Sequence, residues 1–198
     1  MDLDGTLLEC RQRQMTLLQV RAKACAVDID ADSFWNLKRN GLSNRAALSN
    51  FGVSATASRS ICSGWEHSIE DFPWLSFDRL LPGVAEVLTR WRETGNTLHL
   101  VSARRNRCNA MQQLHALSLN IFDSVIFVNP LKLGAKIAAL SDLRPDIYIG
   151  DTERDYDDAI QAGVCPLLVS SGLRAADFLA QHGRCQIADD LVALDRFL

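Results

Sequence analysis

The stretch Ile147-Tyr148-Ile149-Gly150-Asp151-Thr152-Glu153-Arg154-Asp155 decides how we interpret this chain. It begins with an apolar, β-like run and continues into a segment that favours a helix starting near Thr152 or Glu153. Asp151 therefore lies at the carboxyl end of a predicted strand. Asp155 falls one turn inside the predicted helix, from where its carboxylate can point back towards the strand ends.

The same alternation of strand and helix extends from Leu81 to the end of the chain. Further β-like runs are Thr97–Val101, Val125–Val128 and Pro166–Val169. Apolar residues at helical spacing predict the intervening helices: Val84, Val87, Leu88 and Trp91 before Gly95, Tyr156, Ala159 and Ile160 before Gly163, and a further helix near Arg174 to Gln181. Strand–helix alternation with short connections predicts an α/β fold, with a Rossmann-like parallel sheet core flanked by helices on both faces.

Residues 10–80 show a different pattern, with helix-like stretches and no convincing strand. The stretches are Gln14–Val27, Ala31–Lys38, Ser43–Asn50 and Ala55–Glu70. Asp32 or Ser33, and Ser43, are the predicted N-caps. We therefore predict two domains: an α/β core of residues 1–9 and 81–198, and an all-helical cap domain of residues 10–80 inserted into that core.

Composition and charge exclude several classes of protein. A chain of 198 residues suits one domain carrying a sizeable insertion. The net charge of −3 and the absence of a basic block argue against nucleic acid as a partner. No apolar run of about 18 residues is present, so we expect no membrane span. Six scattered cysteines are typical of a reducing compartment, and we expect a cytoplasmic protein. The oligomeric state is left open.

The chain opens with Met1-Asp2-Leu3-Asp4-Gly5-Thr6, in which two aspartates stand two residues apart. On the end of a strand, Asp2 and Asp4 project to the same face, where their carboxylates repel each other. A hard divalent ion with oxygen ligands, most simply Mg²⁺, relieves that repulsion. Thr6 offers a hydroxyl and a backbone N–H to an oxyanion.

The acidic groups of the later stretch fit the same ion. Ligands of α/β sheets bind beyond the carboxyl ends of the strands, so we expect Asp151 to lie near Asp2 as a metal ligand. Asp155 could ligate the ion directly, ligate it through water, or hold Lys136.

Two further segments offer groups suited to a phosphate. Ser102 follows the apolar run 98–101, so its hydroxyl lies at the carboxyl edge of the sheet, and a helix starting near Asn106 can turn N–H groups towards an anion. Lys136, expected just before a short helix, supplies an ammonium that offsets phosphate charge. Lys132 is an alternative that the sequence does not separate from Lys136.

The order of these motifs resembles that of the haloacid dehalogenase-like (HAD) hydrolase superfamily, in its phosphatase branch. The resemblance covers residues 1–9 and 81–198 and rests on D-L-D-G-T-L, V-S-A-R, the lysine and I-G-D-T-E-R-D, of which the first and last are specific. The helical insert resembles the lid that many members carry between the first two motifs. Members have an apolar strand before the first aspartate. Only Met1 precedes Asp2 here, so we expect a truncated or misassigned start rather than a different fold.

The resemblance implies a role for each matching residue. Asp2 would be the nucleophile that forms an aspartyl-phosphate, and Asp4 would protonate the leaving oxygen and then deprotonate the attacking water. Ser102 and Lys136 would hold the phosphoryl oxygens. Mg²⁺ would bind the Asp2 carboxylate, the Asp4 backbone carbonyl and Asp151.

The activity implied is that of a Mg²⁺-dependent phosphatase acting on a small phosphorylated metabolite, such as phosphoglycolate, a sugar phosphate or a nucleotide. The candidate phosphate-binding residues are Thr6, Ser102, Ala103, Arg104 and Lys136, and the candidate metal ligands are Asp2, Asp4, Asp151 and Asp155. Candidate substrate contacts in the insert are Arg39, Asn44 and Arg45. Two alternatives stay open: a phosphomutase on the same scaffold, and a binding module without catalysis.

Overall fold

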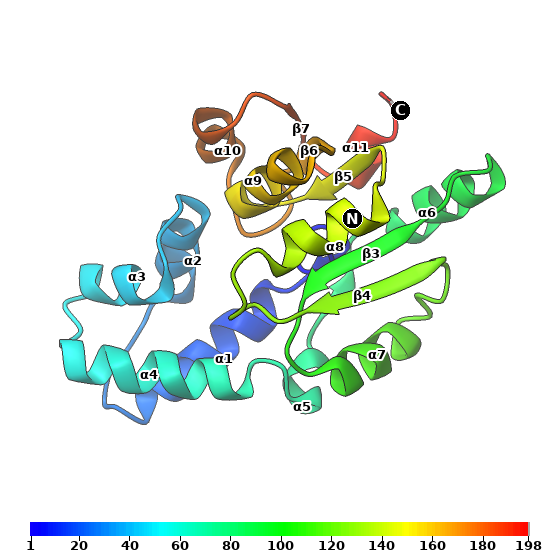
Figure 1. Ribbon diagram of the computed structural model, residues 1–198. Coiled ribbons are helices and arrows are strands. Elements are labelled where there is room, and N and C mark those ends of the chain that lie inside the picture. Colours follow the sequence, from blue (N-terminus) through cyan, green and yellow to red (C-terminus); the bar gives the residue numbers. More distant parts are fainter. Residues whose placement is uncertain (198) are drawn as a thin grey trace.

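The structure of the protein is a computed structural model that describes residues 1–197 (Figure 1). The first part of the chain forms β1 (Leu8–Glu9), α1 (Arg11–Lys23), α2 (Ala31–Arg39), α3 (Asn44–Asn50), α4 (Ala55–Ser68), α5 (Phe72–Leu75) and β2 (Arg79–Leu80). The second part forms α6 (Val84–Glu93), β3 (His99–Ala103), α7 (Arg107–Ala116), β4 (Ser124–Val128), α8 (Ala135–Leu143), β5 (Ile147–Gly150), α9 (Glu153–Ala162), β6 (Cys165–Val169), α10 (Ala176–His182), β7 (Gln186–Ala188) and α11 (Leu191–Leu194). No helix of residues 1–197 is long and apolar enough to cross a membrane.

The core contains a parallel sheet in two parts, joined by the first residues of the chain. β3 pairs with β4, and β5 pairs with β6, which pairs with β7, all in parallel. Between the two parts, Val101 N–H donates to Met1 O (2.9 Å) and Asp2 N–H donates to Ile149 O (2.8 Å). The order across the core is therefore β4, β3, Met1–Asp2, β5, β6 and β7.

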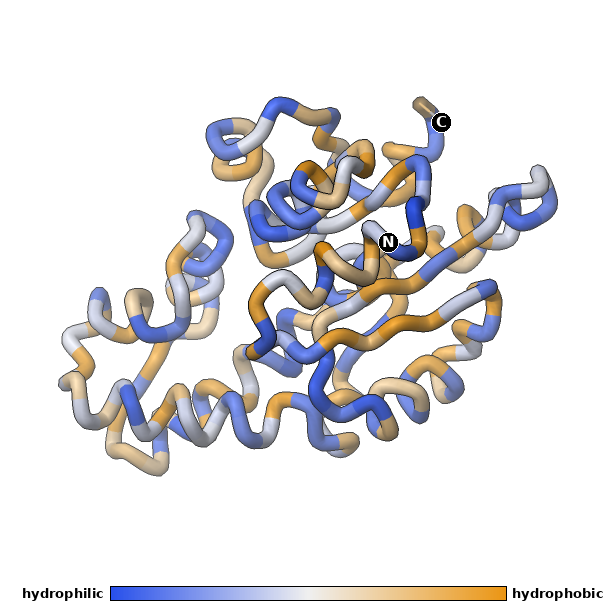
Figure 2. The backbone as a smooth tube through the Cα atoms, viewed as in Figure 1, coloured by the Kyte–Doolittle hydropathy of each residue, from blue (hydrophilic) through white to orange (hydrophobic). Residues whose placement is uncertain are grey.

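Both faces of the sheet are buried, because successive strand residues point to opposite sides. On one face, Leu100 and Ile149 pack in a cluster with residues of α6, α7 and α11. On the other face, Val101 and Tyr148 pack against residues of α8 and α9. Figure 2 shows hydrophobic colour running along β3 and β4. The predicted α/β fold with a helix-covered parallel sheet is confirmed.

Helices α1–α5, which we call the helical insert, lie to one side of the sheet (Figure 1). They have an apolar core of their own, whose buried members include Leu18, Phe34, Leu48 and Ile61. The chain enters and leaves the insert through an antiparallel pair, β1 with β2. The prediction of no strand within residues 10–80 is wrong at this point, because β2 occupies Arg79–Leu80. Two residues are too short for an alternating pattern, and the pairing forms only when the two connections meet.

Several element ends differ from the sequence predictions. The N-cap of α2 is Asp30, whose carboxylate accepts from Ser33 N–H, rather than Asp32 or Ser33, whereas Ser43 caps α3 as predicted. Lys136 lies in the first turn of α8 rather than before it. Asp30, two residues before Asp32, is an equally good acceptor for a helix cap, so residue type alone did not select among the three candidates for α2.

Candidate active site

Parallel pairing brings three distant segments together at one edge of the sheet. Asp2 follows Met1 between β3 and β5, Ser102 lies at the end of β3, and Asp151 follows β5 directly. Asp155 is the third residue of α9. Its carboxylate accepts from the Thr152 N–H while the Thr152 hydroxyl accepts from the Asp155 N–H. This capping box turns the Asp155 side chain back towards the strand ends.

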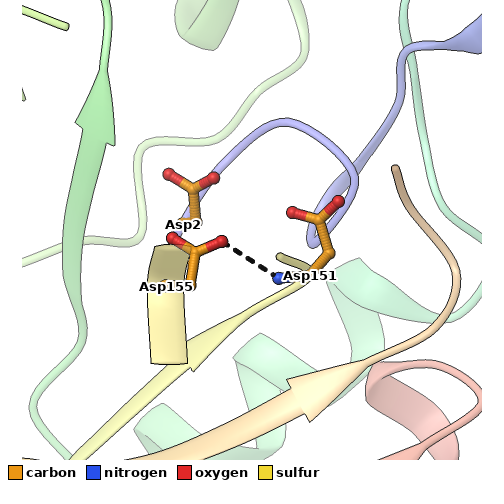
Figure 3. A group of neighbouring side chains, drawn as sticks. All are labelled: Asp2, Asp151 and Asp155. Atoms are coloured by element: carbon orange, nitrogen blue, oxygen red, sulfur yellow. Dashed lines mark hydrogen bonds between the residues drawn. The ribbon is translucent and has the colours of Figure 1, made fainter. Parts of the chain in front are cut away.

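Asp2, Asp151 and Asp155 form a buried group, which we call the carboxylate cluster (Figure 3). One carboxylate oxygen of each lies within 4.8 Å of the others. Close approach of the Asp151 side chain depends on two glycines. A Cβ at Gly5 or at Gly172 would come 2.1 Å from Asp151 Oδ2, so neither position admits a side chain.

Lys136 supplies a cation to the carboxylate cluster. Its Nζ donates to Asp155 Oδ1 (2.7 Å) and to Asp2 Oδ1 (3.3 Å), and only 11% of its side chain is exposed. Although burial favours the neutral amine, Asp155 and Asp2 raise the pKa of Lys136 well above its usual value. Lys132, the alternative, is exposed in the loop before α8. The structure brings Lys136 to Asp2 and leaves Lys132 at the surface.

The three carboxylates differ in their affinity for protons. Burial raises the pKa of Asp2 to about 6, despite Lys136 and a hydrogen bond with Ser102 that act against it. Burial, then Asp155 and Asp2, raise the pKa of Asp151 well above its usual value. Burial acts in the same direction on Asp155, but Lys136 and Thr152 outweigh it and lower the pKa of that group. The cluster therefore holds more negative charge than the protein itself compensates.

Asp4 has a separate environment, and its carboxylate lies outside the carboxylate cluster. Its Oδ1 accepts from Arg13 Nη2 and from Arg104 Nη2, both at 2.7 Å. Burial would raise the pKa of Asp4, but Arg104 and Arg13 lower it. Arg104, which was predicted to contact the phosphate, donates to Asp4. Arg13 was missed, because nothing in the sequence of α1 distinguishes it from a solvated helical arginine.

The remaining predicted phosphate-binding residues surround the carboxylate cluster with different contacts. Thr6 is fully buried, and its hydroxyl donates to Asp151 Oδ1 (3.4 Å). Ser102 is buried beside Asp2, and Ala103 is the exposed last residue of β3. The predicted oxyanion contact of Thr6 thus competes with a hydrogen bond to a carboxylate.

The candidate substrate contacts of the insert have protein partners. Arg39 donates to Ser170 O (2.8 Å) and Gly172 O (3.3 Å), which ties α2 to the loop after β6. Asn44 Oδ1 accepts from Lys38 Nζ (2.6 Å), while Arg45 is exposed. The sequence analysis did not single out Lys38, the buried partner of Asn44. Burial lowers the pKa of Lys38 to about 8.

A family model described as haloacid dehalogenase-like hydrolase matches residues 1–169. The chain belongs to this family. The predicted resemblance is confirmed, and the protein is a haloacid dehalogenase-like hydrolase. Among curated proteins, none matches the chain significantly.

Solved structures share the fold of this haloacid dehalogenase-like hydrolase at low identity. A haloacid dehalogenase-like family hydrolase from Streptococcus pneumoniae has a TM-score of 0.74 and 19% identity, with 100% of this chain and 96% of that chain covered. A predicted phosphoglycolate phosphatase from Haemophilus somnus has a TM-score of 0.70 and 18% identity, covering 99% and 95%. Protein tyrosine kinase A from Mycobacterium tuberculosis has a TM-score of 0.74 and 19% identity, covering 99% and 94%. These three proteins are named for different activities although they share one fold, so the activity of this chain must be argued from its own candidate active site.

Proposed function

We propose that the protein is a Mg²⁺-dependent phosphatase that hydrolyses a small phosphorylated metabolite through an aspartyl-phosphate on Asp2. The observation that carries the proposal is the buried pairing of Asp2 with Lys136 next to Asp151, at the carboxyl edge of a parallel sheet. Together these groups offer a nucleophile, a cation for phosphoryl oxygens and a carboxylate for a metal.

The carboxylate cluster fits Mg²⁺ by the chemistry of its donors. Three buried carboxylates lie beside one ammonium, which contacts only Asp2 and Asp155 among them, and hard oxygen donors are what Mg²⁺ selects. We propose that Asp2, Asp151 and the Asp4 backbone carbonyl hold the ion. The contacts of Asp155 with Lys136 and Thr152 favour the third option predicted for it, namely that it orients Lys136. When bound, Mg²⁺ supplies positive charge that offsets the repulsion between Asp2 and an incoming phosphate.

The proposed reaction has two displacements. An Asp2 carboxylate oxygen attacks phosphorus, the bond from phosphorus to the leaving oxygen breaks, and Asp4 gives that oxygen a proton. Water then attacks the aspartyl-phosphate, Asp4 takes the proton of the water, and inorganic phosphate leaves Asp2. Lys136 and Ser102 hold the phosphoryl oxygens in both steps. Charge neutralisation and positioning account for most of the acceleration in such reactions.

We propose further that the helical insert, with boundaries near residues 10 and 80, acts as the lid that selects the substrate. A hollow of about 500 Å³ opens between the insert and the core and includes Arg39 and Ser171 in its lining. Ser171 donates from its hydroxyl to Gly5 O (3.0 Å), so this hollow adjoins the turn that carries Asp4 and Thr6. Contacts from both domains at one opening favour recognition of the leaving group there.

A phosphate-release screen tests the activity. Phosphoglycolate, sugar phosphates and nucleoside monophosphates are offered to the wild type with MgCl₂ and, in parallel, with EDTA. We expect release from at least one compound, its loss in EDTA, and a loss of about 10³-fold or more in Asp2→Asn.

The matched control is Asp157→Asn, which removes an exposed aspartate of α9 that pairs with His182. This variant should keep full activity. Release from no compound contradicts the proposal. Isomerisation of a sugar phosphate that needs a bisphosphate activator, without free phosphate, indicates the phosphomutase alternative instead.

A further inference from the structure

Asp4 belongs to a closed ring of five side chains, which we call the arginine ring: Asp4, Arg13, Asp78, Gln113 and Arg104. Arg13 Nε donates to Asp78 Oδ1 (3.0 Å), and Gln113 Nε2 donates to Asp78 Oδ2 (2.7 Å). Arg104 Nη2 donates to Gln113 Oε1 (3.3 Å), and both guanidiniums donate to Asp4. All members except Asp4 are at most 3% exposed.

The arginine ring binds the Asp4 carboxylate through only one of its two oxygens. Arg13 and Arg104 both donate to Oδ1, and no hydrogen bond reaches Oδ2 from any of residues 1–197. About a quarter of the Asp4 side chain is exposed, at 23%. Two charge-assisted hydrogen bonds to a single oxygen fix the rotation of the carboxylate and leave its second oxygen unbound.

The members of the ring come from both connections between the core and the insert. Arg13 lies on α1, directly after the chain enters the insert, and Asp78 lies directly before β2, where the chain leaves it. Arg13 also donates from Nη1 to Ile69 O (3.2 Å), at the end of α4. Gln113 on α7 and Arg104 after β3 belong to the core. The carboxylate of Asp4 is thus held jointly by the insert and the core.

We propose that Arg13 is a positioning residue for the reaction: with Arg104, it holds one oxygen of the Asp4 carboxylate so that the other is presented for proton transfer at the leaving oxygen. The inference rests on the proposed function. Arg13 acts through Asp4, and its hydrogen bonds go to Asp4, Asp78 and Ile69 rather than to Asp2. The planar guanidinium of Arg13 donates to Asp4 and to Asp78 from different nitrogens in a fixed geometry, which the ammonium of a lysine does not reproduce.

The orientation of Asp4 matters most for leaving groups that need a proton. Phenolate is a much stronger base than p-nitrophenolate, so phenyl phosphate depends more on protonation of the leaving oxygen than p-nitrophenyl phosphate does. The two compounds have nearly the same shape and the same phosphoryl group. The ratio of their kcat values therefore reports proton transfer, whereas general damage to the fold lowers both values together.

The experiment compares Arg13→Met, Arg13→Lys and Asp78→Asn with the wild type on both compounds in the full chain. Asp78→Asn places an amide where Gln113 Nε2 and Arg13 Nε both require an acceptor, and so breaks the ring without removing Arg13. We expect kcat for phenyl phosphate to fall at least tenfold more than kcat for p-nitrophenyl phosphate in Arg13→Met. KM should stay within about twofold, and Arg13→Lys should be intermediate.

The matched control is Arg21→Lys on the same helix, because Arg21 donates to Ser68 within the insert and does not touch Asp4. It should leave the ratio of kcat values unchanged. An unchanged ratio in folded Arg13→Met or Asp78→Asn overturns the inference, and Asp78→Asn carries the test alone if Arg13→Met does not fold. Phosphate release by the wild type from no compound at all would instead be a failure of the proposed function.

Discussion

Two buried charge groups stand side by side in this hydrolase, and they are balanced differently. The carboxylate cluster sets three carboxylates against the ammonium of Lys136, which leaves an excess of two negative charges. The arginine ring sets two carboxylates against two guanidiniums, which cancel. The first group is therefore suited to an added cation. The charges of the second balance within the protein, although Nε and Nη1 of Arg104 have no hydrogen-bond partner among residues 1–197.

The contrast is sharpest between two aspartates of one short motif. Asp2 and Asp4 are two residues apart, yet burial raises the pKa of Asp2 to about 6, while Arg104 and Arg13 lower the pKa of Asp4 against the effect of burial. A carboxylate with a raised pKa favours a bound cation, and one with a lowered pKa is satisfied by its neighbours. The chemical type of a residue does not decide this difference, because both are aspartates.

The largest expected effect concerns the cation of the carboxylate cluster. Lys136→Ala should lower kcat by about 10³-fold, equivalent to about 4 kcal/mol, because no other side-chain cation contacts Asp2 among residues 1–197. Lys132→Ala is the matched control and should keep its activity, because Lys132 is exposed. Steady-state kinetics on a substrate from the screen measures both. If only Lys132→Ala lost activity, Lys132 rather than Lys136 would be the active-site lysine.

A second prediction compares the two groups by the stability of the metal-free protein. Asp4→Asn removes the negative charge that faces two guanidiniums and should lower the free energy of unfolding by about 2 kcal/mol, a value reduced for the partial exposure of Asp4. Asp151→Asn relieves repulsion with Asp2 and Asp155 and should raise that free energy by about 1 kcal/mol. Urea unfolding in EDTA measures both. If both variants changed the free energy of unfolding in the same direction, the predicted difference between the carboxylate cluster and the arginine ring would be wrong.

The smallest effect concerns pH and Mg²⁺. Asp2 has a pKa raised from 3.8 to about 6, so its contribution to stability is present at low pH and is lost as the pH rises through that interval. If Mg²⁺ binds as proposed, it should restore stability where Asp2 and Asp151 are ionised. The pKa of Asp155 is lowered, so this group does not titrate in that interval.

Addition of about tenfold more Mg²⁺ than its dissociation constant should therefore stabilise the protein by about 1.4 kcal/mol at pH 7.5 and by much less at pH 5. Thermal unfolding with and without MgCl₂ at the two pH values measures the increment. Asp151→Asn, measured in the same way, should show little increment at either pH. An equal increment at both pH values in the wild type would argue against binding at these carboxylates.

Local patterns were sufficient for the sheet and for one half of the site. Apolar runs predicted β3 to β6. Two of these strands, β3 and β5, end next to Ser102 and Asp151, which the structure brings to the same edge as Asp2. Short pieces escaped prediction, because β1, β2 and β7 have two or three residues each and are held by their partners rather than by their own pattern.

The sequence by itself determined the α/β alternation, the family and the order of its motifs, because these depend on periodicity and on residues close together in the chain. Only the tertiary structure decided that Lys136 rather than Lys132 meets Asp2, and that Asp4 pairs with Arg13 and Arg104. Those choices depend on distances between segments up to 134 residues apart. The packing of α8 on the sheet sets the first choice, and the packing of the insert against the core sets the second. No local pattern records either of them.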